Sequence, residues 1–212
     1  MGRHSHITPE MAAAELLRQD LAIESLKGFV HSIDVPGAPV GSDPEGWIFR
    51  PIETGLAAHH ILILDVMQKV ITGILPRAML FLPPGASKST YGSVVAPCWA
   101  MGKYPGTKII LVSYGSDLAR KHGRRARQIV KSPLYTSTFQ TQLDAGSQAA
   151  DEWALTNGSE YMACGILSGI VGNRAIGIII DDPIKGRQEA DSDTVRSRTW
   201  DAYQEDLRTR LI

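Results

Sequence analysis

Three short stretches of apolar residues place the strongest constraint on how this chain folds. They are residues 77–82, 107–113 and 175–180. Continuous apolar runs of this length are typical of strands that are covered on both faces, as in a parallel sheet. Helical patterns occupy residues 89–101, between the first two runs, and 116–130, after the second. This alternation predicts an α/β fold in which right-handed crossovers connect parallel strands.

The region before the first run is predicted to be mainly helical. Residues 8–10 supply a capping threonine, a first-turn proline and an acid, and apolar residues then follow at mostly helical spacing. This helix should end near residues 35–37, and the Gly- and Pro-rich stretch 37–51 is predicted to be a loop. A second helix is predicted over 54–72.

The C-terminal third contains two further local signals. Residues 152–163 alternate in polarity on either side of Asn157-Gly158, which predicts a β-hairpin. Residues 189–211 are polar with a sparse apolar stripe, which predicts an amphipathic helix.

Overall composition excludes several classes of protein. Apolar residues make up 43% and charged residues 21%, and 22 basic residues balance 22 acidic ones, so net charge names no partner. There is no apolar run long enough for a membrane span and no signal-peptide core, which favours the cytoplasm. Cys98 and Cys164 are too few for a disulfide framework and are interpreted as buried structural thiols. Adjacent His59 and His60 lack a third ligand at suitable spacing, which disfavours zinc.

A candidate phosphate-binding loop follows the first apolar run. In such loops, backbone N–H groups before a helix point at the anion, a lysine reaches the terminal phosphates and the next hydroxyl binds magnesium. The pattern G-x-x-x-x-G-K-[ST] is not met, because Leu82 and Ser87 occupy its glycine positions. By itself the stretch also fits an ordinary strand-to-helix loop. The candidate nucleotide-binding residues are Pro84, Gly85, Ala86, Ser87, Lys88, Ser89 and Thr90.

Two adjacent acids, Asp181 and Asp182, end the third apolar run. Ligands of open parallel sheets bind at the carboxyl ends of the strands, where an acid can hold magnesium and a second can orient the attacking water. Such a pair can equally be a solvated turn. The loop at Lys88 favours the functional interpretation, because both features should lie on one edge of the sheet.

In combination, three segments resemble the ATPase portion of the large terminase subunit of tailed bacteriophages. They are FLPPGASKST, KIILVSYGSDLARKHGRRARQIV and GILSGIVGNRAIGIIIDDPIKGRQEADS, within a likeness that runs from about Leu16 to the end. Phosphate loops of that family deviate from the glycine-rich pattern and often begin with Pro-Pro. The resemblance implies a RecA-like (ASCE) P-loop NTPase with a parallel sheet over 53–212, preceded by a helical segment over 1–52.

The resemblance also implies roles at the site, with ATP and Mg²⁺ as cofactors. Lys88 would neutralise the β and γ phosphates, and Ser89 and Asp181 would hold the metal ion. Asp182 would stand where the catalytic carboxylate lies, although related ATPases often have glutamate there.

The basic face of the predicted helix 116–130 has three interpretations. Arg120, Arg124, Arg127 and Lys131 recur at steps of three or four, which is usual for a solvated face. The face could also bind the phosphates of the DNA backbone, without preference for a base sequence. Thirdly, an arginine could reach the γ-phosphate in a neighbouring subunit; the candidates are Arg124, Arg125 and Arg174.

Terminases of this kind package viral DNA, so the resemblance implies double-stranded DNA, a small terminase subunit and the portal as partners. It also implies a ring of copies in the bacterial host cytoplasm. The sequence stops before the family's coupling motif and nuclease domain, so we expect an incomplete fold with two unpaired apolar edges, feeble ATPase activity and no nuclease activity. Two alternatives remain: a helicase-like or recombinase-like ATPase, and an inactive assembly module.

Overall fold

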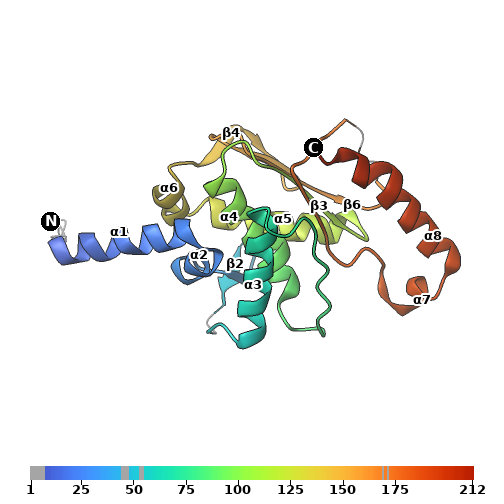
Figure 1. Cartoon of the computed structure of the whole chain (residues 1–212), viewed down its shortest axis with the longest axis horizontal. Coiled ribbons are helices and arrows are strands. Elements are labelled where there is room, and N and C mark those ends of the chain that lie inside the picture. The colour runs from blue at the N-terminus through green and yellow to red at the C-terminus, as the bar shows by residue number, and fades with distance from the viewer. Residues whose placement is uncertain (1–7, 44–47, 53–54, 169, 171) are drawn as a thin grey trace.

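The computed structural model shows an α/β protein built on a five-stranded sheet with helices on both faces (Figure 1). It describes residues 8–43, 48–52, 55–168, 170 and 172–212. The strands of the sheet are β3 (Lys108–Ser113), β4 (Leu143–Gln148), β5 (Glu152–Leu155), β6 (Glu160–Gly165) and β7 (Gly177–Ile180). The α-helices are α1 (Pro9–Glu24), α2 (Leu26–Ser32), α3 (Ala58–Ile71), α4 (Ala96–Lys103), α5 (Ser116–Val130), α6 (Pro133–Phe139), α7 (Gly186–Ala190) and α8 (Asp193–Ala202). Two π-helical segments, η1 (Thr90–Val95) and η2 (Tyr203–Leu207), and a 3₁₀ turn, η3 (Arg208–Arg210), complete the helical elements.

The sheet is mixed rather than wholly parallel, in the order β4-β5-β6-β3-β7. At its centre β3 pairs in parallel with β6 and with β7, so that Ile109 lies opposite both Tyr161 and Gly177. The other two strands, β5 and β4, are antiparallel to their neighbours. The predicted parallel pairing of residues 107–113 with 175–180 is confirmed in β3 and β7, and the predicted hairpin is present as β5 and β6. The prediction of a parallel sheet as a whole was wrong, because the hairpin turn at Gly158, with φ of 83°, reverses the chain and makes the sheet mixed.

Alternating residues of β3 face two separate hydrophobic cores. Ile109 and Leu111 join the larger core, and Ile110 and Val112 join the smaller one. In the larger core, buried side chains of η1, α4, α5 and α6 pack around Trp99. Because both faces of β3 are covered, its continuous apolar pattern is explained, and the prediction of a buried strand here is confirmed.

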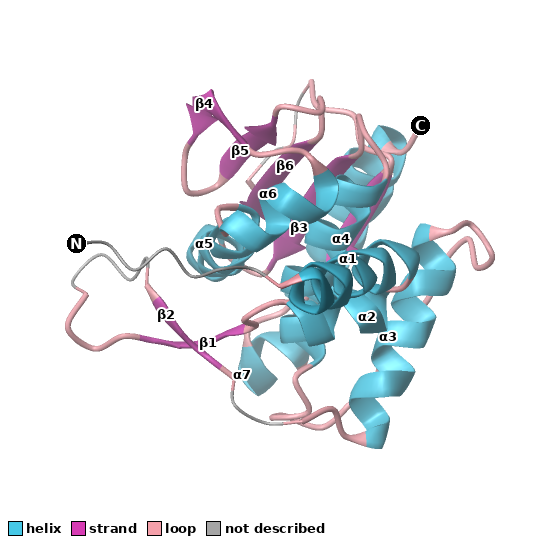
Figure 2. Ribbon diagram, turned by 90° about the vertical axis from the view of Figure 1, so that its left-hand side faces the viewer, coloured by secondary structure: helices cyan, strands magenta, loops and turns pink. Residues whose placement is uncertain are grey.

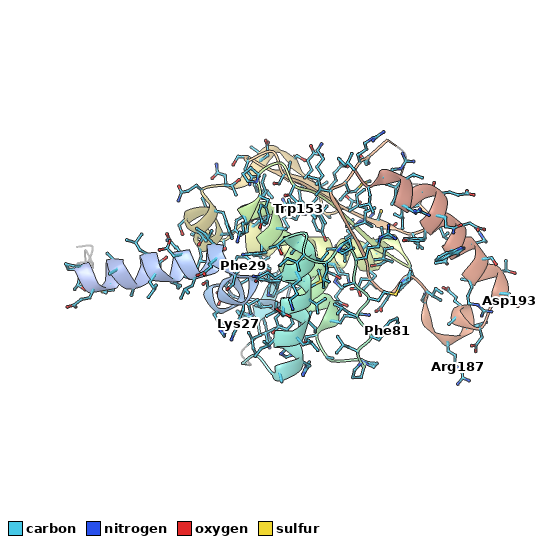
Figure 3. The ribbon with its side chains drawn as sticks, in the orientation of Figure 1. Lys27, Phe29, Phe81, Trp153, Arg187 and Asp193 are labelled. Carbon is cyan, nitrogen blue, oxygen red and sulfur yellow. The ribbon has the colours of Figure 1, made fainter. Side chains whose placement is uncertain are left out.

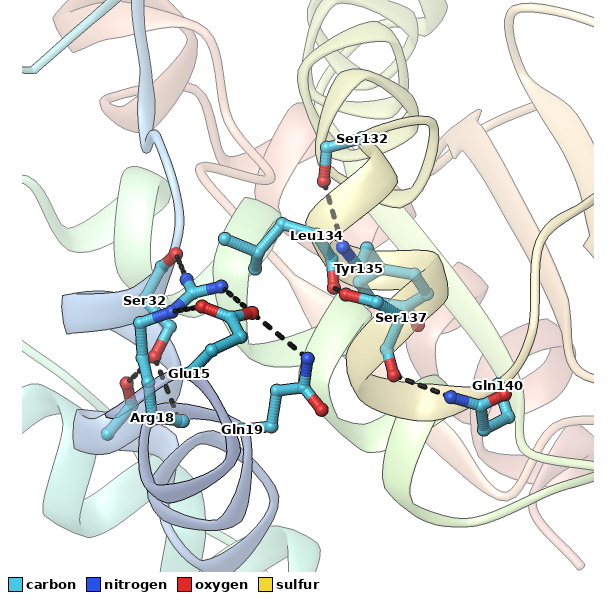
Figure 4. A network of polar contacts seen from close by, with 10 residues as sticks. Glu15, Arg18, Gln19, Ser32, Ser132, Leu134, Tyr135, Ser137 and Gln140 are labelled. Atoms are coloured by element: carbon cyan, nitrogen blue, oxygen red, sulfur yellow. Dashed lines mark hydrogen bonds and ion pairs between the residues drawn. The ribbon is translucent and has the colours of Figure 1, made fainter. Parts of the chain in front are cut away.

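The predicted N-terminal helix is present, but it breaks at Ser25 into α1 and α2. Thr8 caps α1 as predicted, and the Ser25 hydroxyl accepts a hydrogen bond from Gly28 N–H to start α2. Arg18 of α1 then donates to the Ser32 carbonyl at 2.7 Å and pairs with Glu15, which joins the two helices (Figure 4). The N-terminal part of α1 extends away from the body of the molecule (Figure 1).

The sequence predicted a loop over residues 37–51, but part of this stretch forms strands. It contributes to a two-stranded antiparallel ribbon (Figure 2) of β1 (Pro36–Pro39) and β2 (Phe49–Pro51), while 44–47 lie outside the described residues. Gln128 of α5 both accepts from Phe49 N–H and donates to its carbonyl. A long-range contact of this kind is invisible to local propensity. In the second predicted helix, α3 begins at Ala58 and residues 53–54 are not described.

The prediction of a buried strand at residues 77–82 was wrong. This segment has no secondary structure, and the side chains of Met79 and Phe81 are 84% and 88% exposed. Phe81 projects from the lower margin of the molecule (Figure 3). A strand requires a ladder partner, and no described strand pairs with this segment or with the outer edge of β7. Local apolarity alone therefore did not make a strand.

The predicted C-terminal helix is divided among α7, α8, η2 and η3. The segment α8 lies beside the sheet on the side away from α5 (Figure 1), and Ala202 and Leu207 join the smaller core there. Leu207 is fully buried in the smaller core, whereas Trp200 is 56% exposed. No helix in the described part of the chain is long and apolar enough to cross a bilayer.

Candidate functional site

The loop ending in Lys88 meets the end of β7, although the two are far apart in sequence. Lys88 Nζ lies 2.7 Å from Asp182 Oδ1 and 3.6 Å from Asp181 Oδ1. One ammonium group thus contacts both acids. The structure therefore brings together the two features that the sequence placed on one edge of a sheet.

Strand β3 fixes the backbone of both acids. Asp181 N–H donates to the Val112 carbonyl at 2.8 Å, and Tyr114 N–H donates to the Asp182 carbonyl at 3.0 Å. The two side chains nevertheless differ in how far they are exposed to solvent. The Asp181 carboxylate is only 3% exposed, whereas that of Asp182 is 57% exposed. One acid is held inside the protein and the other reaches solvent.

The backbone at the site is strained. Ser87 has φ of 58° and Asp182 has φ of 46°, and they are two of the three non-glycine residues with positive φ in the described part of the chain. Left-handed conformations of this kind cost free energy and cluster at functional sites. Ser87 occupies a glycine position of the usual phosphate-loop pattern, so the loop adopts a shape that glycine would adopt more easily. Gly85, with φ of 83°, supplies a second left-handed residue.

Two side chains that the sequence did not identify contact the buried acid. The Ser93 hydroxyl donates to Asp181 Oδ2 at 2.9 Å, and His122 Nε2 lies 3.5 Å from the same oxygen. Ser93 lies in η1 and His122 on the buried face of α5, where the sequence pattern indicated only packing. The sequence offered one indication that Ser93 belongs to the site: it follows Ser89 by four residues, which places the two serines on the same face of a helix.

Burial and neighbouring charges shift the pKa values of two residues at the site. Burial lowers the pKa of Lys88, but the hydrogen bond to Asp182 and the charges of both acids outweigh burial and raise it overall. Burial lowers the pKa of His122, and the charge of Asp181 offsets only part of that effect. Lys88 is therefore a cation at neutral pH, and His122 favours its neutral form.

The three candidate arginines lie in different places. Arg125 is 7% exposed and donates to the Pro36 carbonyl and, at 2.9 Å, to the Thr90 hydroxyl. In this arrangement Arg125 joins β1 to η1 and faces inward rather than toward another subunit. Arg124 is half-buried on α5, and Arg174 is exposed before the amino end of β7, away from the acids.

The basic face of α5 makes contacts within the chain. Arg120 pairs with Asp151 and Asp117, while the opposite face is buried. These findings weaken a continuous phosphate-tracking stripe on α5.

The oxygen atoms at the site suit a magnesium ion. Magnesium is usually held by one or two carboxylates together with substrate phosphate oxygens. Asp181 and Asp182 supply carboxylate oxygens, and the ammonium group of Lys88 shows that a cation is accommodated against both acids. Ser89 directly precedes η1, next to Lys88 in the loop. Among the residues that the structure describes, no group of three or more His, Cys, Asp and Glu side chains gathers to form a cage. An ion here would therefore depend on ligand oxygens as well.

Comparison with protein families gives one match over most of the chain. The family model described as terminase large subunit, T4likevirus-type, N-terminal, matches residues 79–209. This range contains the loop, both acids, Ser93 and His122. Comparison with curated proteins and with solved structures gives no match.

Proposed function

Since this chain belongs to the terminase large subunit family of the T4-like type, which indicates a role in phage DNA packaging, we propose that it hydrolyses ATP to drive that packaging. The contact of Lys88 with both acids at the carboxyl end of β7 carries the proposal. In the proposed P-loop NTPase fold of RecA-like type, the loop 84–90 holds the nucleotide at this edge of the sheet.

Each residue has a defined part in the proposed reaction. Lys88 leaves the acids and neutralises the β and γ phosphates, as a phosphate-loop lysine does. Ser89 and Asp181 hold the magnesium ion, which when bound neutralises charge that develops on the phosphates. Asp182, which is exposed beside Asp181, orients the attacking water and accepts its proton.

The remaining proposals follow from family membership. Double-stranded DNA, the small terminase subunit and the portal are the proposed partners, with several copies assembled in a ring in the cytoplasm of the bacterial host. Arg124 and Arg174 remain the candidates for an arginine supplied to a neighbouring subunit. Arg125 would have to leave the Pro36 carbonyl and the Thr90 hydroxyl to take that role.

A second candidate function is an assembly module without ATPase activity. The segment 77–82 favours it, because its exposed side chains Met79 and Phe81 offer apolar surface to a partner, while Leu80 and Leu82 pack against the larger core. The ion pairs of Lys88 with the acids are compatible with it as well, since they satisfy these charges without any nucleotide.

Calorimetry with ATP or ADP and magnesium separates the two candidates. Wild-type protein should bind nucleotide, and Lys88→Ala should lose at least tenfold in affinity, because a charge-assisted contact to phosphate is removed. Lys108→Ala is the matched control, because it removes an exposed lysine that pairs with Glu160 at 2.8 Å, on the same sheet. Absence of binding by folded wild-type protein, or equal affinity in Lys88→Ala, would support the assembly module instead.

A further inference from the structure

We propose that Ser93 and His122 are positioning residues that hold one oxygen of Asp181, so that only the other oxygen is presented to the metal ion. The inference rests on the proposed function, since it concerns how the same site binds magnesium. It assigns a role to two residues outside the loop and the paired acids.

The two oxygens of Asp181 have separate partners. Oδ2 receives the Ser93 hydroxyl at 2.9 Å and lies 3.5 Å from His122 Nε2. Oδ1 lies on the side of Lys88, at 3.6 Å. A carboxylate whose oxygens are both free can rotate about its last torsion and present either one, or both together, to a cation. Contacts to Oδ2 alone remove that freedom, and a hydrogen bond to an ionised oxygen is among the stronger ones.

Both residues are themselves held in place. Ser93 is 3% exposed and lies within the π-helical segment η1, a geometry that occurs frequently at functional sites. Gly123, next to His122, lets α5 lie close to the sheet, because a Cβ at that position would be 2.8 Å from the Ala150 carbonyl oxygen. The His122 side chain, 5% exposed, therefore has little room to turn away from Asp181.

The burial of His122 also has an unfavourable free energy that packing alone does not explain. Its Nδ1 atom is buried and has no hydrogen-bond partner among the described residues. Leaving a buried polar atom unpaired costs free energy, so a side chain chosen only for packing at this position would be apolar. The other ring nitrogen, Nε2, faces the Asp181 carboxylate, so the proposed positioning role accounts for a histidine at this place.

Removal of the Ser93 hydroxyl should weaken the metal ion without affecting the phosphate contacts. Loss of a residue that orients a metal ligand typically lowers metal affinity by about 10 to 100-fold. Nucleotide binding in the absence of metal depends on Lys88 and the loop backbone, so Ser93→Ala should leave it unchanged.

The test is a titration of Mn²⁺ into the protein with ADP, followed by electron paramagnetic resonance, beside calorimetry of ADP in EDTA. Ser93→Ala should bind Mn²⁺ about 10 to 100-fold more weakly with unchanged metal-free ADP affinity, and Ser93→Thr, which keeps the hydroxyl, should restore Mn²⁺ binding. Ser113→Ala is the matched control, because the Ser113 hydroxyl is buried and has no partner among the described residues. This control should bind Mn²⁺ as wild type does.

The outcomes distinguish the inference from the proposed function. Wild-type Mn²⁺ affinity in folded Ser93→Ala overturns the inference and leaves the ATPase proposal standing. Failure of wild-type protein to bind Mn²⁺ with ADP overturns both. If Ser93→Ala does not fold, the same titrations are made with His122→Leu. Weakened Mn²⁺ binding with unchanged metal-free ADP affinity supports the positioning role. Unchanged Mn²⁺ binding contradicts it.

Discussion

The ion pair between Lys88 and Asp182 must break when a nucleotide enters the site, and this gives a quantitative prediction for Asp182→Asn. The two charged groups lie 2.7 Å apart, but their side chains are 30% and 57% exposed. Water and salt screen a pair of this exposure, so its net contribution is about 1 kcal/mol or less. Asparagine tolerates the left-handed backbone of this position nearly as well as aspartate, so the substitution adds little strain.

Nucleotide affinity and turnover should therefore respond in opposite ways. Without the charge of Asp182, Lys88 is freer to reach phosphate, so a non-hydrolysable ATP analogue should bind as tightly as to wild type or up to about fivefold tighter. Turnover should fall by about 10² to 10⁴-fold, because a general base contributes that much to a proton transfer. The assays are calorimetry with the analogue and phosphate release with ATP.

The matched control is Glu160→Gln, which removes one acid of an exposed ion pair with Lys108 of similar length, 2.8 Å, and similar exposure. It should change neither nucleotide affinity nor turnover. If Asp182→Asn lost nucleotide affinity to the same extent as Lys88→Ala, Asp182 would contribute to binding the ground state, and its assignment to the reacting water would be wrong.

Two further predictions concern the scaffold and its thiols. Gly28→Ala should lower the free energy of unfolding by about 3 kcal/mol in urea denaturation, because a Cβ there would lie 2.0 Å from the Leu21 carbonyl oxygen between α1 and α2. Gly41→Ala, where a Cβ meets nothing within 4 Å, should stay within about 1 kcal/mol of wild type, and equal losses in both would refute the packing argument. Cys98 and Cys164 should react slowly with a thiol reagent at pH 8, since burial raises the pKa of Cys164 to about 11 and that of Cys98 further. Rapid labelling of both thiols in the absence of urea would show that they are not buried.

Most secondary structure was predictable where local signals and tertiary partners agreed. The Thr8 cap, the Asn157-Gly158 hairpin and the buried pattern of β3 all appear in the structure, because each either needs only neighbouring residues or is covered on both faces. The segment 77–82 has an equally apolar sequence and forms no strand. The difference lies in the partner: β3 has a strand on each side, whereas no described strand pairs with 77–82.

Only the tertiary structure revealed several contacts between residues that are far apart in the sequence. The sequence offered Arg125 as a candidate for an arginine that reaches a neighbouring subunit, but its guanidinium group is buried against Pro36 and Thr90, from separate parts of the chain. The start of α2, where Leu26 N–H donates to Gln68 Oε1 at 2.8 Å, and the ribbon of β1 and β2 likewise involve contacts with residues distant in sequence.

For the candidate site, the sequence determined which residues are available: a lysine and hydroxyl after a turn, and two acids at a strand end. These are local patterns, and they need only the chemistry of adjacent residues. The tertiary structure decided that Lys88 contacts both acids, that Asp181 is buried while Asp182 is exposed, and that the Ser93 hydroxyl and His122 Nε2 both lie next to one oxygen of Asp181. The register of β7 on β3 and the close approach of η1 and α5 set these distances, and such long-range packing leaves no periodic trace in the sequence.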